Sequence, residues 1–144
     1  MVVLITGING FIGRHLSRAL LEKGYGVKGT VRSREKIVSL SEATNIYVTE
    51  DIGPTTDWSD ILDNIDVIIH LAAHVHVMNK TSDNTLMEYR HVNTFGTEHL
   101  AVQAAAAGVK RMIYLSTIKV NGEMTNNKSF VEEAQPSPED FYVL

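Results

Sequence analysis

Short, uninterrupted apolar runs separated by amphipathic stretches set the pattern of this chain. The first run, residues 1–5, is continuous and β-branched, which predicts a strand buried on both faces. Four further strands are expected at 25–31, 45–49, 66–71 and 111–116. Because these runs alternate with helical patterns, the strands are expected to pair in parallel.

Helical periodicity fills the intervals between the apolar runs. Residues 11–23 form an amphipathic pattern whose buried face is expected to contain Ile12, Leu16, Ala19 and Leu20. A short helix is predicted at 57–63, and a long helix at 84–107 with a break near Gly96. The long helix is expected to stop at Gly108. The pattern predicts an α/β fold, a Rossmann-like doubly wound parallel sheet, in one domain spanning residues 1–144.

The turn after the first strand carries the clearest chemical motif. Residues 6–13 read Thr-Gly-Ile-Asn-Gly-Phe-Ile-Gly. The first glycine permits a tight turn, the second lets a pyrophosphate approach the backbone, and the third lets helix and strand pack closely. The helix that follows points its N–H groups and positive dipole end at the phosphates. A dinucleotide cradle is therefore predicted from Gly7, Asn9, Gly10, Phe11, Ile12 and Gly13.

This motif resembles the extended branch of the short-chain dehydrogenase/reductase superfamily, which holds nucleotide-sugar epimerases, dehydratases and reductases. The resemblance runs the length of the chain. It implies that Asp51 and Ile52 lie beside the adenine, that Leu71, Ala72 and Ala73 approach the cofactor ribose, and that Asn93 holds backbone near the active site. An aspartate after a strand is also a common turn residue, which stays an alternative for Asp51. Where the family often carries a cofactor-contacting lysine, this chain has Val75.

The segment after the second strand bears on the choice of cofactor. NAD-preferring members of the resembled family place an aspartate at the position of Val31, whereas this chain continues Arg32–Ser33–Arg34. A guanidinium can grip a 2′-phosphate with two hydrogen bonds, so Arg32 and Ser33 favour NADP over NAD. Two alternatives stay open: Arg32 only stacks on adenine while NAD binds, or the segment is a solvated basic loop.

The fifth strand leads into a segment that resembles the family's catalytic strand end. Alignment on Val120 and Gly122 puts Thr117 at the catalytic Ser/Thr position. Tyr142 then falls at about the spacing expected for the family's catalytic tyrosine. In the family's Tyr-x-x-x-Lys motif a lysine helps lower the tyrosine pKa, but the sequence ends at Leu144 before that position. The expectation is therefore an N-terminal fragment, inactive alone, of an enzyme that is a homodimer at full length.

The resemblance implies oxidation or reduction at C4 of a nucleotide-linked sugar, by a UDP-sugar 4-epimerase or a 4-keto-sugar reductase. The segments 73–79 and 118–123 resemble a bacterial branch that makes surface polysaccharide. One alternative is an NADPH-dependent reductase of small carbonyl compounds. Another is a non-catalytic NAD(P)-binding regulatory or scaffold protein.

Composition narrows these classes further. Thirteen Lys and Arg against seventeen Asp and Glu give a net charge of −4, which argues against nucleic-acid binding. The absence of cysteine removes disulfides and thiolate metal sites and fits a cytoplasmic protein. No apolar run has the length of a membrane span. His74 and His76 are spaced like a ligand pair, but no third ligand of suitable spacing follows, so no metal site is predicted.

Overall fold

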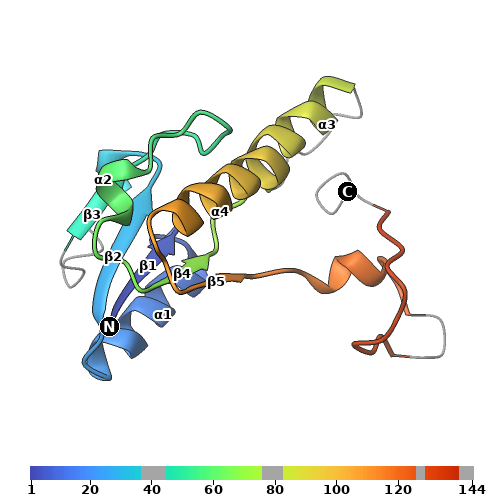
Figure 1. Ribbon diagram of the computed structural model, residues 1–144. Helices are drawn as coiled ribbons and strands as arrows, with labels where there is room; N and C mark the ends of the chain where they lie inside the picture. Colours follow the sequence, from blue (N-terminus) through green and yellow to red (C-terminus); the bar gives the residue numbers. More distant parts are fainter. Residues whose placement is uncertain (37–44, 76–82, 126–128, 140–144) are drawn as a thin grey trace.

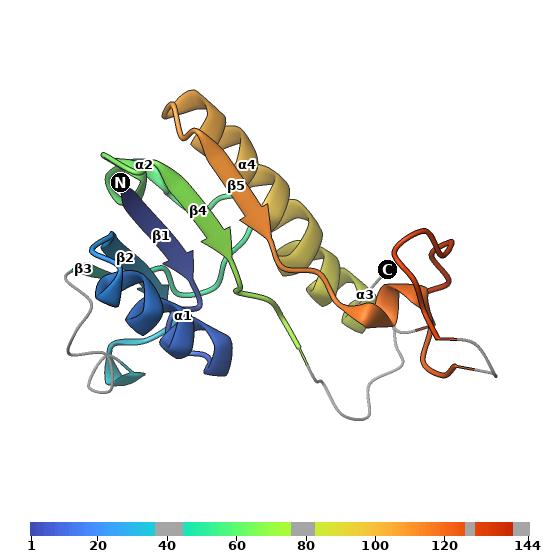
Figure 2. The same ribbon diagram turned by 90° about the horizontal axis from the view of Figure 1, so that it is seen from below.

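The structure, a computed structural model, describes residues 1–36, 45–75, 83–125 and 129–139. Its centre is one sheet of five parallel strands in the order β3-β2-β1-β4-β5 (Figure 2). The strands are β1 (Val2–Thr6), β2 (Gly26–Val31), β3 (Asn45–Val48), β4 (Val67–His70) and β5 (Arg111–Tyr114). The predicted doubly wound α/β sheet is confirmed, with the order reversing between β1 and β4.

The register of the strands aligns their carboxyl ends. Thr6 at the end of β1 lies opposite Thr30 on one side and opposite His70 on the other. His70 in turn lies opposite Tyr114 of β5. Parallel pairing thus brings four side chains that are distant in sequence into one row at the sheet edge, beside the switch point.

Helices cover both faces of the sheet (Figure 1). On one face lies α1 (Phe11–Glu22). On the other lies a long helical rod, formed by α3 (Asp83–Tyr89), a π-helical segment η2 (Arg90–Gly96) and α4 (Thr97–Ala106). The remaining short elements are η1 (Arg34–Lys36), α2 (Ser59–Leu62) and η3 (Ile118–Asn121).

The alternation of side chains along β1 feeds two separate cores. Leu4 points into the core beneath the rod, where it packs with Trp58, Ile68 and Leu100. Val3 and Ile5 point the other way, into the core beneath α1. Each of these β1 side chains is at most 2% exposed, which fits a strand buried on both faces.

The predicted buried face of α1 was wrong at two of its four positions. Ile12 is half exposed and lines the cleft described below, and Ala19 is exposed. The fully buried residues of α1 are instead Gly13 and Ser17. A Cβ on Gly13 would lie 2.6 Å from the Gly7 carbonyl oxygen, so only small residues fit where the helix crosses the turn.

The long helix does not break at Gly96, contrary to the sequence prediction. Residues 83–106 stay helical throughout, and the irregularity is the π-helical turn that ends at Gly96. A Cβ on Gly96 would lie 2.9 Å from a methyl group of Ile52. Gly96 therefore serves the close approach of the rod to the segment after β3 rather than the end of a helix.

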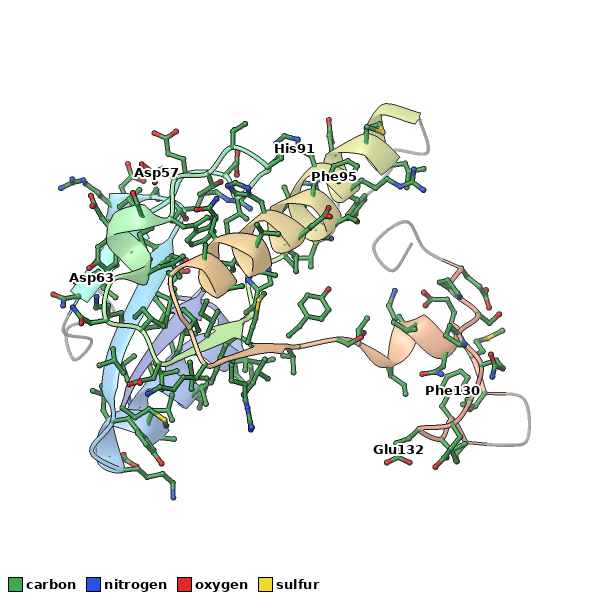
Figure 3. The ribbon with its side chains drawn as sticks, viewed as in Figure 1. Asp57, Asp63, His91, Phe95, Phe130 and Glu132 are labelled. Atoms are coloured by element: carbon green, nitrogen blue, oxygen red, sulfur yellow. The ribbon has the colours of Figure 1, made fainter. Side chains whose placement is uncertain are left out.

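After β5 the chain leaves the sheet. Phe130 and Glu132, labelled in Figure 3, lie on this excursion, well away from the strands. None of the helices in the described parts of the chain is long and apolar enough to cross a membrane.

We expect Gly13→Ala to lower the free energy of unfolding by about 2–3 kcal/mol, because the added methyl group meets backbone atoms that cannot rotate away. Gly24→Ala is the matched control at the other end of α1: its φ of +78° disfavours alanine, but nothing lies within 4 Å. That control should lose only about 1 kcal/mol. Chemical denaturation followed by circular dichroism measures both, and equal losses would contradict the packing argument.

Candidate functional site

A cleft with a volume of about 620 Å³ opens at the carboxyl edge of the sheet. It lies at the switch point between β1 and β4, where open α/β sheets bind ligands. The residues that line it lie at or after the carboxyl ends of the five strands, with Val92 added from the rod: Gly7, Asn9, Gly10, Ile12, Thr30, Val31, Arg32, Thr49, Glu50, Ile52, His70, Leu71, Ala72, Ala73, Val75, Val92, Tyr114, Leu115, Ser116 and Thr117.

The floor of the cleft is the turn between β1 and α1. Gly7 has a φ of +68°, and a Cβ there would lie 3.2 Å from the Ala72 backbone. Ile8 is fully buried and its side chain lies over Gly29 of β2, where a Cβ would meet it at 2.5 Å. Its N–H donates to the Thr30 carbonyl over 3.2 Å. The turn is thus fixed against β2 by a backbone hydrogen bond and by the buried side chain of Ile8.

The first turn of α1 suits an anion. Its N-cap residue is Gly10, and no side chain caps the N-terminus. Gly10 and Ile12 both line the cleft, so uncapped N–H groups and the positive helix end face the open space. These features fit the pyrophosphate of a dinucleotide, which a helix start of this kind binds through backbone N–H groups.

At the far side of the cleft two residues predicted to have separate roles contact each other. Arg32 Nε lies 3.1 Å from Asp51 Oδ1, and both side chains are well exposed. Arg32 lines the cleft, whereas Asp51 belongs to a neighbouring polar hollow that also includes His91. Ile52 lines the cleft and Ser33 does not. The guanidinium that was expected to meet a 2′-phosphate therefore already has a carboxylate beside it.

The last residue of β4 at the cleft, His70, is a buried histidine. His70 Nδ1 lies 2.7 Å from Thr6 Oγ1, and its Nε2 lies 3.0 Å from Thr97 Oγ1 on α4. The residue is 1% exposed, and this burial lowers the pKa of its imidazole from 6.5 to about 4. His70 is therefore neutral at ordinary pH and serves as a hydrogen-bonding residue rather than a charge.

Asn93 holds the backbone of the loop that follows β4 at His74. The Asn93 side chain accepts a hydrogen bond from the His74 N–H over 2.7 Å and donates to the His74 carbonyl over 3.1 Å. Asn93 does not line the cleft, so it supports the backbone, as the resemblance implied. The His74 ring packs edge-on against Tyr89 with centroids 5.0 Å apart, and His76 lies outside the described residues.

Thr117 lies where β5 leads out of the sheet and lines the cleft together with Ser116. Its oxygen accepts a long hydrogen bond, 3.4 Å, from the Lys119 N–H and starts η3. An acceptor role leaves the hydroxyl proton free to be donated. Tyr142, the other predicted catalytic residue, lies outside the described residues.

Of the predicted binding residues, Phe11 and Gly13 also lie off the cleft lining: Phe11 is exposed and Gly13 is a packing position. Sequence reasoning passed over several residues with a place at the site, namely Thr6, Thr30, Glu50, His70, Val92 and Tyr114. The signal available for Thr6 and His70 was their position within one residue of the end of a predicted strand, since the carboxyl ends of parallel strands meet.

Comparison with known proteins agrees with this geometry. The sequence model of the NAD dependent epimerase/dehydratase family matches residues 3–143. The chain belongs to this family. It is 42% identical over 144 residues to the UDP-glucose 4-epimerase of Vibrio cholerae, covering 99% of this chain and 43% of that protein. The resemblance to extended short-chain dehydrogenases and nucleotide-sugar epimerases is thus confirmed.

Solved structures of the family show the same fold. The chain superposes on UDP-glucuronic acid 4-epimerase from Bacillus cereus in complex with NAD with a TM-score of 0.79 and 30% identity, over 99% of this chain and 48% of that one. MoeE5 in complex with UDP-glucose and NAD gives a TM-score of 0.80 and 29% identity, over 99% and 44%. The chain spans less than half the length of these family members.

The buried His70 predicts how stability depends on pH. Above pH 6.5 the imidazole is neutral in both states; between 6.5 and about 4 the unfolded chain takes up a proton that the folded chain refuses. As the pH is lowered through this window, the free energy of unfolding should therefore decrease, and the contribution of His70 to this decrease should be on the order of 3 kcal/mol.

Urea denaturation at a series of pH values tests this expectation. His70→Asn should flatten the pH dependence, whereas His15→Asn, at an exposed histidine of α1, should leave it in place. Parallel curves for the wild type and His70→Asn would contradict the assignment.

Proposed function

We propose that a protein carrying this chain binds NAD(P) in the cleft and oxidises or reduces C4 of a nucleotide-linked sugar. The activity would be that of a UDP-sugar 4-epimerase or a 4-keto-sugar reductase. One observation carries the proposal: the Thr117 hydroxyl and the uncapped start of α1 line the same cleft. The relatives named UDP-glucose 4-epimerase and UDP-glucuronic acid 4-epimerase support a nucleotide-sugar substrate.

The residues divide the work by position. The backbone of the β1–α1 turn and the first N–H groups of α1 would hold the pyrophosphate. Small side chains at Ala72 and Ala73 leave room for the ribose beside the end of β4. Thr117 would donate a hydrogen bond to the substrate oxygen, and Tyr142 would exchange the hydroxyl proton. Bound NAD(P) supplies the hydride acceptor and donor.

Substrate turnover tests the proposal. With UDP-glucose and added cofactor, a protein carrying this chain should form the C4 epimer, or should reduce a UDP-4-keto sugar, as seen by product chromatography. Thr117→Ala should lower turnover by about 100-fold, because the substrate oxygen loses its hydrogen-bond donor. Thr125→Ala is the control, at an exposed position away from the cleft. Conversion of small ketones but of no UDP-linked or dTDP-linked sugar would favour the small-carbonyl reductase instead.

Within this proposal the cofactor choice depends on Arg32. The guanidinium favours NADP, since it can bind a 2′-phosphate, while the Asp51 carboxylate 3.1 Å away competes for it and repels the phosphate. Relatives solved with NAD show that the family fold takes the unphosphorylated cofactor. We propose that NADP keeps a slight advantage, reduced by Asp51.

We expect Asp51→Asn to raise the affinity for NADPH relative to NADH by about threefold, because an exposed ion pair contributes 1 kcal/mol or less. Asparagine keeps an oxygen for the adenine amino group, so NADH binding should change little. Asp60→Asn removes the same charge from an exposed position on α2 and is the control. Calorimetric titration measures both cofactors, and an unchanged ratio in Asp51→Asn would contradict the competition.

Two further proposals concern the whole protein. Ala101, Val102 and Ala105 form part of the exposed face of α4, and a smooth face of this kind supports a homodimer. A cytoplasmic location stays a prediction from the absence of cysteine.

A further inference from the structure

Thr6 is the centre of a buried hydrogen-bond cluster at the switch point of the sheet. Its hydroxyl oxygen accepts the N–H of Leu71 over 3.1 Å and the N–H of Ala72 over 3.1 Å. The same oxygen lies 2.7 Å from His70 Nδ1. Thr6 and His70 are 0% and 1% exposed, so water does not compete for these bonds.

Counting protons and lone pairs fixes the state of the histidine. A hydroxyl oxygen has two lone pairs and one proton, and the two backbone N–H groups use both lone pairs. The Thr6 proton must then be donated to His70 Nδ1, which has to be an acceptor. A neutral imidazole that accepts at Nδ1 carries its hydrogen on Nε2, and this hydrogen is donated to Thr97 Oγ1 over 3.0 Å.

The cluster acts on the backbone that faces the cofactor cleft. Leu71 and Ala72 line the cleft, and the Ala72 backbone lies 3.2 Å from where a Cβ of Gly7 would stand. A small shift of residues 71–72 would therefore either bring them into collision with the β1–α1 turn or open a gap beside that turn. Because Thr6 is the residue directly before Gly7, its hydroxyl group sets the distance between the β1–α1 turn and the backbone of residues 71–72.

We propose that His70 is a positioning residue for cofactor binding: as the neutral Nε2–H tautomer it accepts the Thr6 proton, and so directs the Thr6 oxygen to the two N–H groups of the wall at 71–72. The proposal rests on the proposed binding of NAD(P). It assigns no contact between His70 and the reacting atoms; the imidazole acts through Thr6. Thr97 holds the other side of the ring and ties the cluster to α4.

Nitrogen NMR of the imidazole tests the tautomer without any cofactor. In the wild-type chain at neutral pH the His70 resonances should show a protonated Nε2 and an unprotonated Nδ1. Thr97→Val should leave this tautomer in place, because the Thr6 proton still needs an acceptor. Thr6→Val should abolish the preference of His70 for this tautomer, and Thr6→Ser should restore the preference. A wild-type His70 protonated on Nδ1 would overturn the proposal.

Cofactor titration tests the consequence for binding. Thr6→Val should weaken NADH binding by about tenfold, since two buried N–H groups lose their acceptor, and Thr6→Ser should recover most of the loss. His70→Leu should also weaken binding by about tenfold. His70→Asn should come within about threefold of the wild type, because an amide oxygen near the position of Nδ1 can still accept the Thr6 proton.

Ser17→Ala is the control for a merely structural effect. Ser17 is a buried hydroxyl of α1 that bonds the Arg14 carbonyl over 3.0 Å, away from the cleft lining. It should lower stability and leave NADH binding unchanged. If His70→Leu does not fold, the Thr6→Val and Thr6→Ser pair decides the question by the same titration.

The outcomes separate the two proposals. A wild-type protein carrying this chain that binds neither NADH nor NADPH overturns the proposed function, and with it the role of His70 in binding. A wild-type chain that binds, with folded Thr6→Val and His70→Leu binding equally well, overturns the positioning role alone. Weak binding by both, with recovery in Thr6→Ser and His70→Asn, supports it.

Discussion

At Gly7 and Gly13 the packing of the turn between β1 and α1 leaves room for backbone atoms alone, and the rest of the site depends on this constraint. Gly7 passes against the backbone of Ala72, and Gly13 passes against the Gly7 carbonyl. Because no side chain stands between them, α1 starts close to the sheet with its N–H groups facing the cleft. The placement of α1, the position of its uncapped N-terminus and the path of the chain after β4 are therefore linked by these close approaches.

A change of chemistry along the strands marks where the core ends and the site begins. The middle of β1 is aliphatic and buried on both faces, and β4 is aliphatic with one face buried and the other partly buried, whereas their last residues are Thr6 and His70. Buried polar groups of this kind are tolerated because each has a partner, and an orphaned one would cost about 1–3 kcal/mol. Because each of these buried polar groups needs a hydrogen-bond partner, few arrangements of Thr6 and His70 at this edge of the sheet are possible.

Local pattern was enough to predict the sheet and the glycine turn before α1, since both follow from short apolar runs and glycine spacing. Contacts between distant segments were not accessible in the same way. Half of the buried face of α1 was predicted, since Leu16 and Leu20 pack on the core. Ile12 and Ala19 were wrong because the helix buries the small residues Gly13 and Ser17 instead. The role of Gly96 was missed because its close approach to Ile52 is a contact between segments distant in sequence.

The same limit applies to the polar pairs of the site. Arg32 with Asp51, and Thr6 with His70, come together only through the strand order and register. These pairs also differ in physics. The Thr6–His70 pair is dry, so its hydrogen bonds are strong and tolerate few substitutions. The Arg32–Asp51 pair is exposed and screened, so replacing either partner alters little of the fold. The Thr6–His70 pair is thus coupled to the stability of the core, whereas the charge of the Arg32–Asp51 pair can change with little effect on the fold.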